Sequence, residues 1–370
     1  MKLELKKTGR YPFPMGVMDF CLQANAQRAY AACMDGIFAI DFPPADNNRD
    51  KPLPKRIGGH DSYVSSIALS ANNTTLYSSA YDGRIHSRII NESTSDLVEP
   101  NWNEAIHPFW SWQMVLSPDE KWLASVTGQY LAGAEDYTPQ PSSEPTVKLM
   151  DAVQGKVIHA WNMLPSVQCV TIDPSSKYVA AANLMGDVAV YEIETGKEVA
   201  TWRTKSFTSW GIIKSHCYIG GIFALMFSPD SATLYVAGMG DMRDPMAGNG
   251  KQLWQRFDWK KSPAEKTQES HADDTGEGLM EALAFHPSGK YFAMGGRLRG
   301  GNWNVGFFDA DSGRLIGQAK TGMRITTIRF SADGQTVFLG GMQGQPGLKD
   351  GKFPDFGYLE RFTITESSDV

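Results

Sequence analysis

Two groups of side chains in this sequence could bind a metal ion. The first lies in one acidic segment and consists of His271, Asp273, Asp274 and Glu277. Oxygen-rich segments bind Ca²⁺, but this spacing matches no EF-hand, so a solvated acidic loop is the simpler interpretation. The second group could hold Zn²⁺ or Fe²⁺ only if the fold brings its members together, and it consists of His107, His216 and His271.

The sequence contains no Gly-rich phosphate loop, nucleophile elbow or HExxH motif. It therefore predicts no bound cofactor.

A third group of side chains is suited to binding a protein. Aromatic and arginine residues contribute most of the affinity of protein interfaces when they lie together on an exposed face. The candidates here are Tyr63, Trp110, Tyr130, Tyr137, Arg243, Arg297, Arg299, Trp303 and Arg324. For any one aromatic ring, packing of a long loop onto the body of the protein is the simpler interpretation. Which interpretation holds depends on the elements that carry these residues.

One pattern recurs along the whole chain: an apolar strand, a tight turn and a second apolar strand. Met280 to Gly296 is a clear copy, with turn residues at Pro287 to Lys290 between two alternating apolar runs. The last apolar residue before each turn marks seven copies, spaced 45 to 58 residues apart: Leu22, Leu69, Leu116, Ile172, Phe227, Phe285 and Phe330. Repetition at this period indicates a repeat fold.

A third strand and a hairpin into a fourth complete each clear unit, as in Val188 to Glu192 followed by Gly196-Lys197. Four antiparallel strands per unit are typical of a propeller blade. We therefore predict an all-β, seven-bladed β-propeller spanning residues 1–370 as a single domain. The blades begin near residues 16, 63, 110, 166, 221, 279 and 324.

The two ends of the chain predict how the ring closes. The seventh unit lacks a fourth strand, and Lys2 to Thr8 alternates apolar and charged residues before the first unit begins. Pairing of residues 1–10 with the last blade would remove the exposed edges of an open ring.

The second unit carries a more specific resemblance. Gly59-His60 is followed by Val64, Ile67 and Leu69, and then by Tyr81-Asp82-Gly83-Arg84-Ile85. In this spacing the chain resembles the WD40-repeat family, with degenerate repeats of the bacterial type. The resemblance implies that His60 and Asp82 belong to a structural hydrogen-bond set with a Ser or Thr. Arg88 or its neighbour stands where that family has its repeat-ending Trp.

The insertions between second and third strands should all emerge on one face, and they are Gly128 to Pro145, Gly238 to Lys251, Gly295 to Asn304 and Gly341 to Phe356. Residues just before the inner strands, such as Tyr63, Trp110 and Arg324, should surround the mouth of the channel there. We expect a non-enzymatic scaffold that binds a protein or peptide on this face. The alternative is a metal- or cofactor-dependent enzyme with its site at the same channel mouth.

Composition narrows the class of partner and the location. The formal net charge is −6, without a Lys/Arg stripe, which argues against nucleic acid as a partner. No run approaches the 18 apolar residues of a membrane span, and Met1 to Lys7 lead into no apolar signal segment. The sequence therefore predicts a cytoplasmic protein without a membrane span.

Overall fold

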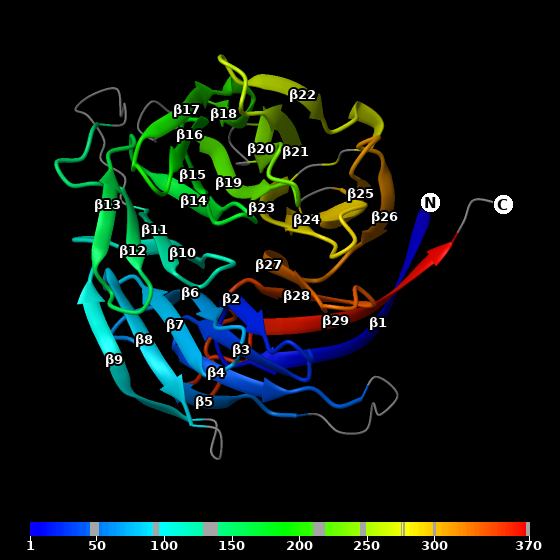
Figure 1. Cartoon of the computed structure of the whole chain (residues 1–370). Coiled ribbons are helices and arrows are strands. Elements are labelled where there is room, and N and C mark those ends of the chain that lie inside the picture. The colour runs from blue at the N-terminus through cyan, green and yellow to red at the C-terminus, as the bar shows by residue number, and fades with distance from the viewer. Residues whose placement is uncertain are drawn as a thin grey trace.

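The repeated strand–turn–strand pattern forms the blades of a propeller. In this computed structural model, residues 1–44, 52–91, 96–128, 140–209, 219–244, 249–274, 276, 278–298 and 301–367 are described. Within these ranges, seven antiparallel sheets surround a central channel (Figure 1). The prediction of an all-β, seven-bladed propeller is confirmed.

The first strand of each unit is the inner strand of its blade and faces the channel. These strands are β2 (Val17–Leu22), β6 (Val64–Leu69), β10 (Ser111–Leu116), β14 (Val167–Ile172), β19 (Ile219–Phe227), β23 (Gly278–Phe285) and β27 (Arg324–Phe330). The second strands are β3 (Arg28–Cys33), β7 (Thr75–Ala80), β11 (Trp122–Thr127), β15 (Tyr178–Asn183), β20 (Leu234–Asp244), β24 (Tyr291–Leu298) and β28 (Thr336–Met342).

The third and fourth strands complete the blades outward. The third strands are β4 (Gly36–Asp41), β8 (Arg84–Ile90), β12 (Val147–Asp151), β16 (Asp187–Glu192), β21 (Asn249–Asp258), β25 (Val305–Asp309) and β29 (Gly357–Ser367). The outer strands are β5 (Lys55–Gly58), β9 (Leu97–Ala105), β13 (Val157–Trp161), β17 (Glu198–Arg203), β22 (Glu265–Glu269), β26 (Leu315–Ala319) and β1 (Lys2–Phe13). The fifth blade has one addition, the two-residue strand β18 (Thr208–Ser209), which pairs with β19.

Apolar contact between neighbouring blades forms the core. The described residues contain seven buried clusters, and each joins two adjacent blades. Trp254 of blade 5, for example, is fully buried with Phe292 and Phe308 of blade 6. Because a blade buries its apolar faces only against its neighbours, the ring is stable only when every joint is made.

The last joint is made by the N-terminal strand, as predicted. β1 pairs with β29 from Lys2 opposite Ser367 to Phe13 opposite Gly357, and the two strands lie side by side in Figure 1. The fully buried carboxylate of Glu360 receives the Lys7 ammonium at 2.7 Å and the Arg10 guanidinium at 3.5 Å. Strand pairing and these ion pairs together hold the N-terminal strand β1 against β29, the third strand of blade 7.

A β-bulge recurs at one position in the inner strands of all seven blades. The strand register shifts there by one residue, for example between Val64 and Ser66 against β7. An extra residue of this kind bends the strand and re-aims a side chain. The bulged residues all line the channel, and they are Met18, Ser65, Trp112, Gln168, Phe223, Glu281 and Thr326.

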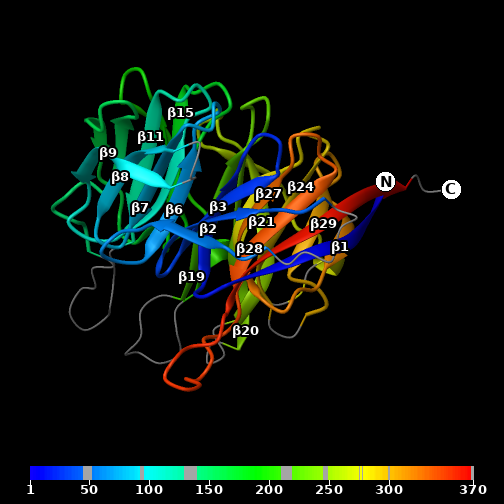
Figure 2. The same cartoon turned by 90° about the horizontal axis from the view of Figure 1, so that it is seen from below.

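One long connection shows which face of the ring carries an insertion. The 343–356 connection, red in Figure 2, projects from the lower side of that view. The insertion predicted at Gly238–Lys251 is mostly not a loop, because β20 and β21 continue as one hairpin to Asp244 and from Asn249. We call this side of the ring the loop-bearing face.

We predict that Lys7→Ala combined with Arg10→Ala destabilises the ring by about 3 kcal/mol, since the buried Glu360 carboxylate would lose both cations. Urea unfolding followed by tryptophan fluorescence measures this. The control is Lys2→Ala with Lys6→Ala on the same strand, which removes equal charge but no ion pair among the described residues. Equal destabilisation by the two double variants would contradict the assignment.

Candidate binding site at the channel mouth

A stack of aromatic rings lies beside the channel mouth on blades 2 and 3. Tyr81, in the turn between β7 and β8, stacks on Trp110 at 4.8 Å and on Trp112 at 5.6 Å, with interplanar angles of 14° and 13°. Phe109 stacks on Trp110 at 4.7 Å, and Tyr63 lies tilted against Tyr81 at 5.8 Å. We call these five residues the aromatic stack.

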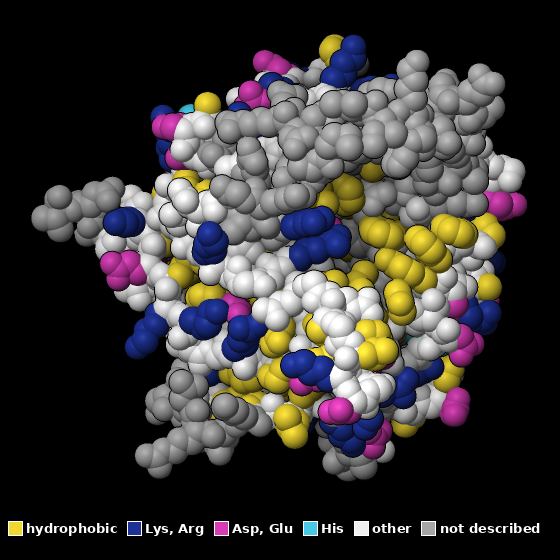
Figure 3. All heavy atoms as spheres, turned by 180° about the vertical axis from the view of Figure 1, so that it is seen from behind, with side chains coloured by type: hydrophobic (Ala, Val, Ile, Leu, Met, Phe, Trp, Pro, Cys, Tyr) yellow, Lys and Arg dark blue, Asp and Glu magenta, His cyan; other side chains and the backbone are white. Residues whose placement is uncertain are grey.

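Part of this stack faces solvent. Tyr63 is 45% exposed and Trp110 is 40% exposed, whereas most of the large apolar side chains that the structure describes are buried. Figure 3 shows the loop-bearing face, where hydrophobic side chains gather on one side of a central hollow. Contiguous exposed apolar surface beside polar groups marks interaction sites. Burial raises the pKa of Tyr81 to about 12.

An ion pair between blades 6 and 7 lies on the other side of the mouth from the aromatic stack. Arg324, the first residue of β27, donates from Nε and Nη2 to the two carboxylate oxygens of Glu281 on β23. Burial alone would lower the pKa of Arg324, but its bonds with Glu281 raise it above the ordinary value. Both side chains line the same channel as Trp112. The mouth therefore has an aromatic wall and a charged wall.

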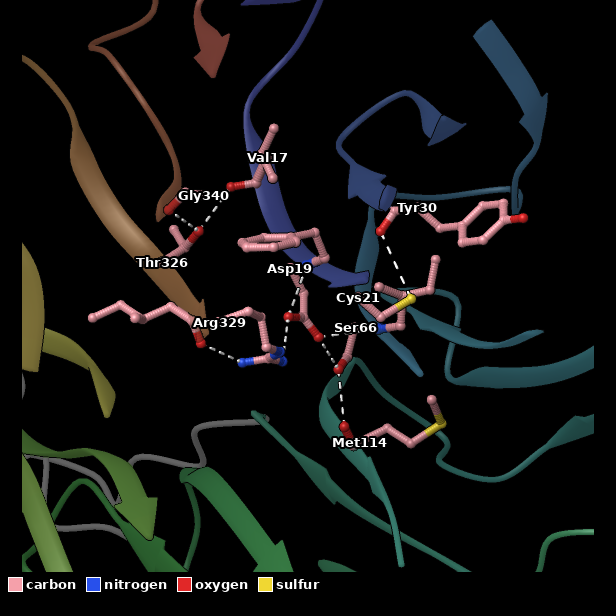
Figure 4. Close-up of polar contacts among 12 residues, drawn as sticks. Val17, Asp19, Cys21, Tyr30, Ser66, Met114, Thr326, Arg329 and Gly340 are labelled. Carbon is pink, nitrogen blue, oxygen red and sulfur yellow. Dashed lines mark hydrogen bonds and ion pairs between the residues drawn. The ribbon is translucent and has the colours of Figure 1, made fainter. Parts of the chain in front are cut away.

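Deeper in the channel, a second ion pair links four blades (Figure 4). Asp19 accepts a hydrogen bond from Arg329 Nη2 at 3.0 Å, and its other oxygen lies 2.8 Å from Ser66 Oγ. Ser66 Oγ is also 2.9 Å from the carbonyl oxygen of Met114, and the Ile67 amide donates to Asp19 at 3.1 Å. These contacts join blades 7, 1, 2 and 3, so Arg329 serves the fold below the mouth.

The structure places the predicted binding residues unevenly. Tyr63, Trp110 and Arg324 lie at the mouth, and the exposed side chain of Arg297 lies nearby at the end of β24. Trp303 departs from the prediction of an exposed anchor: it is 4% exposed, because its ring covers the core between blades 5 and 6 beside Phe308. The remaining predicted residues lie outside the described side chains, and they are Tyr130, Tyr137, Arg243 and Arg299.

Sequence reasoning missed four residues of the mouth: Phe109, Trp112, Tyr81 and Glu281. Trp112 and Glu281 are bulge residues, which stand four positions before the apolar residue that ends each inner strand. This fixed position in the repeat is the sequence signal that could have identified Trp112 and Glu281. Strand alternation alone does not distinguish it, because the bulge adds a residue that alternation does not count.

The acidic segment is held against the outer rim of blade 6. Asp273 accepts two contacts from Arg314 Nη1, at 2.9 and 3.0 Å, and Asp274 accepts the Leu315 amide at 3.0 Å. His271 Nε2 lies 3.0 Å from the carbonyl oxygen of Ser312. Glu277 and His216 lie outside the described residues. Among the residues that are described, no three His, Cys, Asp or Glu side chains form a metal-binding group.

The other histidines named in the sequence belong to the blades. His107 is 3% exposed and its Nε2 lies 3.1 Å from Ser125 Oγ. His60 lies 3.2 Å from Asp82 and 2.9 Å from Ser78 Oγ, which is the hydrogen-bond set that the family resemblance implied. Burial alone would raise the pKa of Asp82, but the bonds from His60 and the Arg84 amide lower it. His86 stacks on His60 at 3.8 Å.

Comparison with known proteins agrees with this geometry. The family model described as WD domain, G-beta repeat matches residues 51–86, which include His60 and Asp82. No curated protein matches the chain. No helix among the described residues is long and apolar enough to cross a membrane.

We predict that acid destabilises the fold through buried histidines. Burial, followed by the charge of Lys148, lowers the pKa of His107 to about 3, and burial also lowers that of His86 to about 3. In the unfolded chain each imidazole binds a proton near its ordinary pKa of about 6.5. Between these values the unfolded state binds more protons, so the free energy of unfolding decreases by about 1.4 kcal/mol for each histidine as the pH is lowered by one unit.

His107→Gln tests this, because Gln can still bond Ser125 but does not titrate. Urea unfolding at a series of pH values should give the variant a slope shallower than the wild type by about 1.4 kcal/mol per pH unit. Identical slopes would show that His107 does not set the acid sensitivity.

Proposed function

The chain is a WD40-repeat β-propeller, and we propose that it is a scaffold that binds a protein partner at the channel mouth of its loop-bearing face. Propellers of this family are commonly protein-interaction scaffolds. The observation that carries the proposal is the aromatic stack, with Tyr63 45% and Trp110 40% exposed.

The geometry of the stack suits it to binding. Its rings are fixed before a partner arrives, because Tyr81 is held between Trp110 and Trp112 and the latter is set by the β10 bulge. Fixed aromatic surface loses little conformational entropy on binding, which is why such residues dominate interface affinity. The Arg324–Glu281 pair across the mouth adds directional hydrogen bonding.

No observation on the described residues favours the alternative of a metal- or cofactor-dependent enzyme. That alternative required histidines and carboxylates to converge at the mouth. Instead His107 is buried against Ser125 of blade 3. His271, Asp273 and Asp274 contact the turn between the third and outer strands of blade 6 and the first residue of its outer strand. The scaffold is therefore the function that we carry forward.

We predict that Trp110→Ala lowers partner capture by about tenfold or more, as expected for a central aromatic anchor. The whole chain is immobilised, and proteins captured from a lysate of the source cells are quantified by mass spectrometry. The matched control is Ile158→Ala, which lies on the outer strand β13 of the same blade and is similarly exposed, at 42%. Partners retained by Trp110→Ala and wild type alike would refute binding at the mouth.

A further inference from the structure

A groove extends from the charged wall of the mouth across blades 6, 7 and 1. Arg324 lines both the channel and this groove, so the two are continuous. The groove encloses about 540 Å³, a volume typical of sites that hold a few side chains of a ligand. Its lining comes from the end of β24, the start of β27, the β28–β29 connection and the β3–β4 turn.

The floor of this groove is apolar and adaptable. Met34 is half-buried in the β3–β4 turn, Met342 is 9% exposed at the end of β28, and Phe356 is 3% exposed. Methionine side chains are flexible and polarisable, and they accommodate varied apolar groups. The floor can therefore receive an aliphatic or aromatic side chain.

The groove carries the uncompensated positive charge of Arg297, although the whole chain carries a formal net charge of −6. Arg297 is exposed and makes no ion pair with any described residue. Arg324 uses Nε and Nη2 for Glu281, which leaves its Nη1 group available. No Asp or Glu occurs among the described lining residues. Figure 3 shows Lys and Arg side chains beside the central hollow, opposite the hydrophobic side chains.

We propose that this groove binds an acidic segment of the protein partner. An Asp or Glu carboxylate of that segment bonds Arg297 and the Nη1 group of Arg324, and a neighbouring apolar side chain packs on Met34, Met342 and Phe356. The inference rests on the proposed function, because the same segment continues onto the aromatic stack.

A carboxylate fits this place better than a cation or a more highly charged anion. A basic segment would meet Arg297 without a lining carboxylate to compensate it. A doubly charged phosphate would be repelled more strongly by the Glu281 carboxylate than a singly charged carboxylate would. The guanidinium of Arg297, which has no ion pair with a described residue, can bond a carboxylate through two parallel N–H donors, which gives geometry as well as attraction.

The experiment pans a random-peptide phage library on the whole chain and sequences the recovered peptides. The expected pool combines Asp or Glu with apolar residues. A recovered peptide, made with a fluorescent label, is then titrated by polarisation against wild type and Arg297→Glu. We expect Arg297→Glu to weaken binding by about tenfold or more, and added salt to weaken binding to the wild type.

The matched control is Lys290→Glu, in the turn just before the same strand β24 and on the opposite face, with the same change in charge. It should bind the peptide like the wild type. A pool without acidic residues, or undiminished binding by Arg297→Glu, overturns the acidic groove. If such peptides still require Trp110, the proposed function survives that result. Recovery of no peptide above background, or peptide binding that Trp110→Ala does not weaken, overturns both the acidic groove and the proposed function.

Discussion

In a ring of blades, each sheet buries its apolar faces only against its two neighbours, so one open joint would expose two faces at once. The pairing of β1 with β29 closes the last joint over the whole length from Lys2 to Phe13. Phe13 and Tyr11 fill the core against blade 1, while Leu3 fills the core against blade 6. The same strand carries the cations that neutralise Glu360. The channel and its mouth keep their shape because this strand holds the circle at seven blades.

In the closed ring, the repeated bulge determines which side chains line the channel. It adds one residue at the same place in every inner strand and turns that side chain toward the axis. The fold does not fix the type of this residue, which is Trp112 in blade 3 and Glu281 in blade 6. The bulge is needed for the shape of every blade, but the side chain at the bulge can vary and can therefore contact a partner. The aromatic wall and the charged wall both follow from that freedom, whereas Asp19 and Arg329 below them bind blades together.

The parts of this structure that sequence could predict are those with local signals. Apolar alternation and turn residues located the inner strands, and the missing fourth strand of the last unit assigned Lys2–Thr8 to closure. Tyr63, Trp110 and Arg324 were predicted at the mouth because the repeat pattern puts them where the inner strands begin. Trp112 and Glu281 were missed, since a bulge depends on register and not on residue type. The burial of Trp303 was missed too, because packing between blades 5 and 6 is a contact between distant residues that the local pattern does not encode.

Amide hydrogen exchange, followed by mass spectrometry with and without a peptide selected on the whole chain, tests the central claim most directly. The claim is that one face of the propeller recognises its partner through the aromatic wall and the adjoining groove. It predicts slower exchange in the bound state at residues 61–64, 81–83, 108–113 and 321–324, which surround the mouth. Protection confined to the turns of the opposite face, such as 117–121 and 286–290, would contradict it.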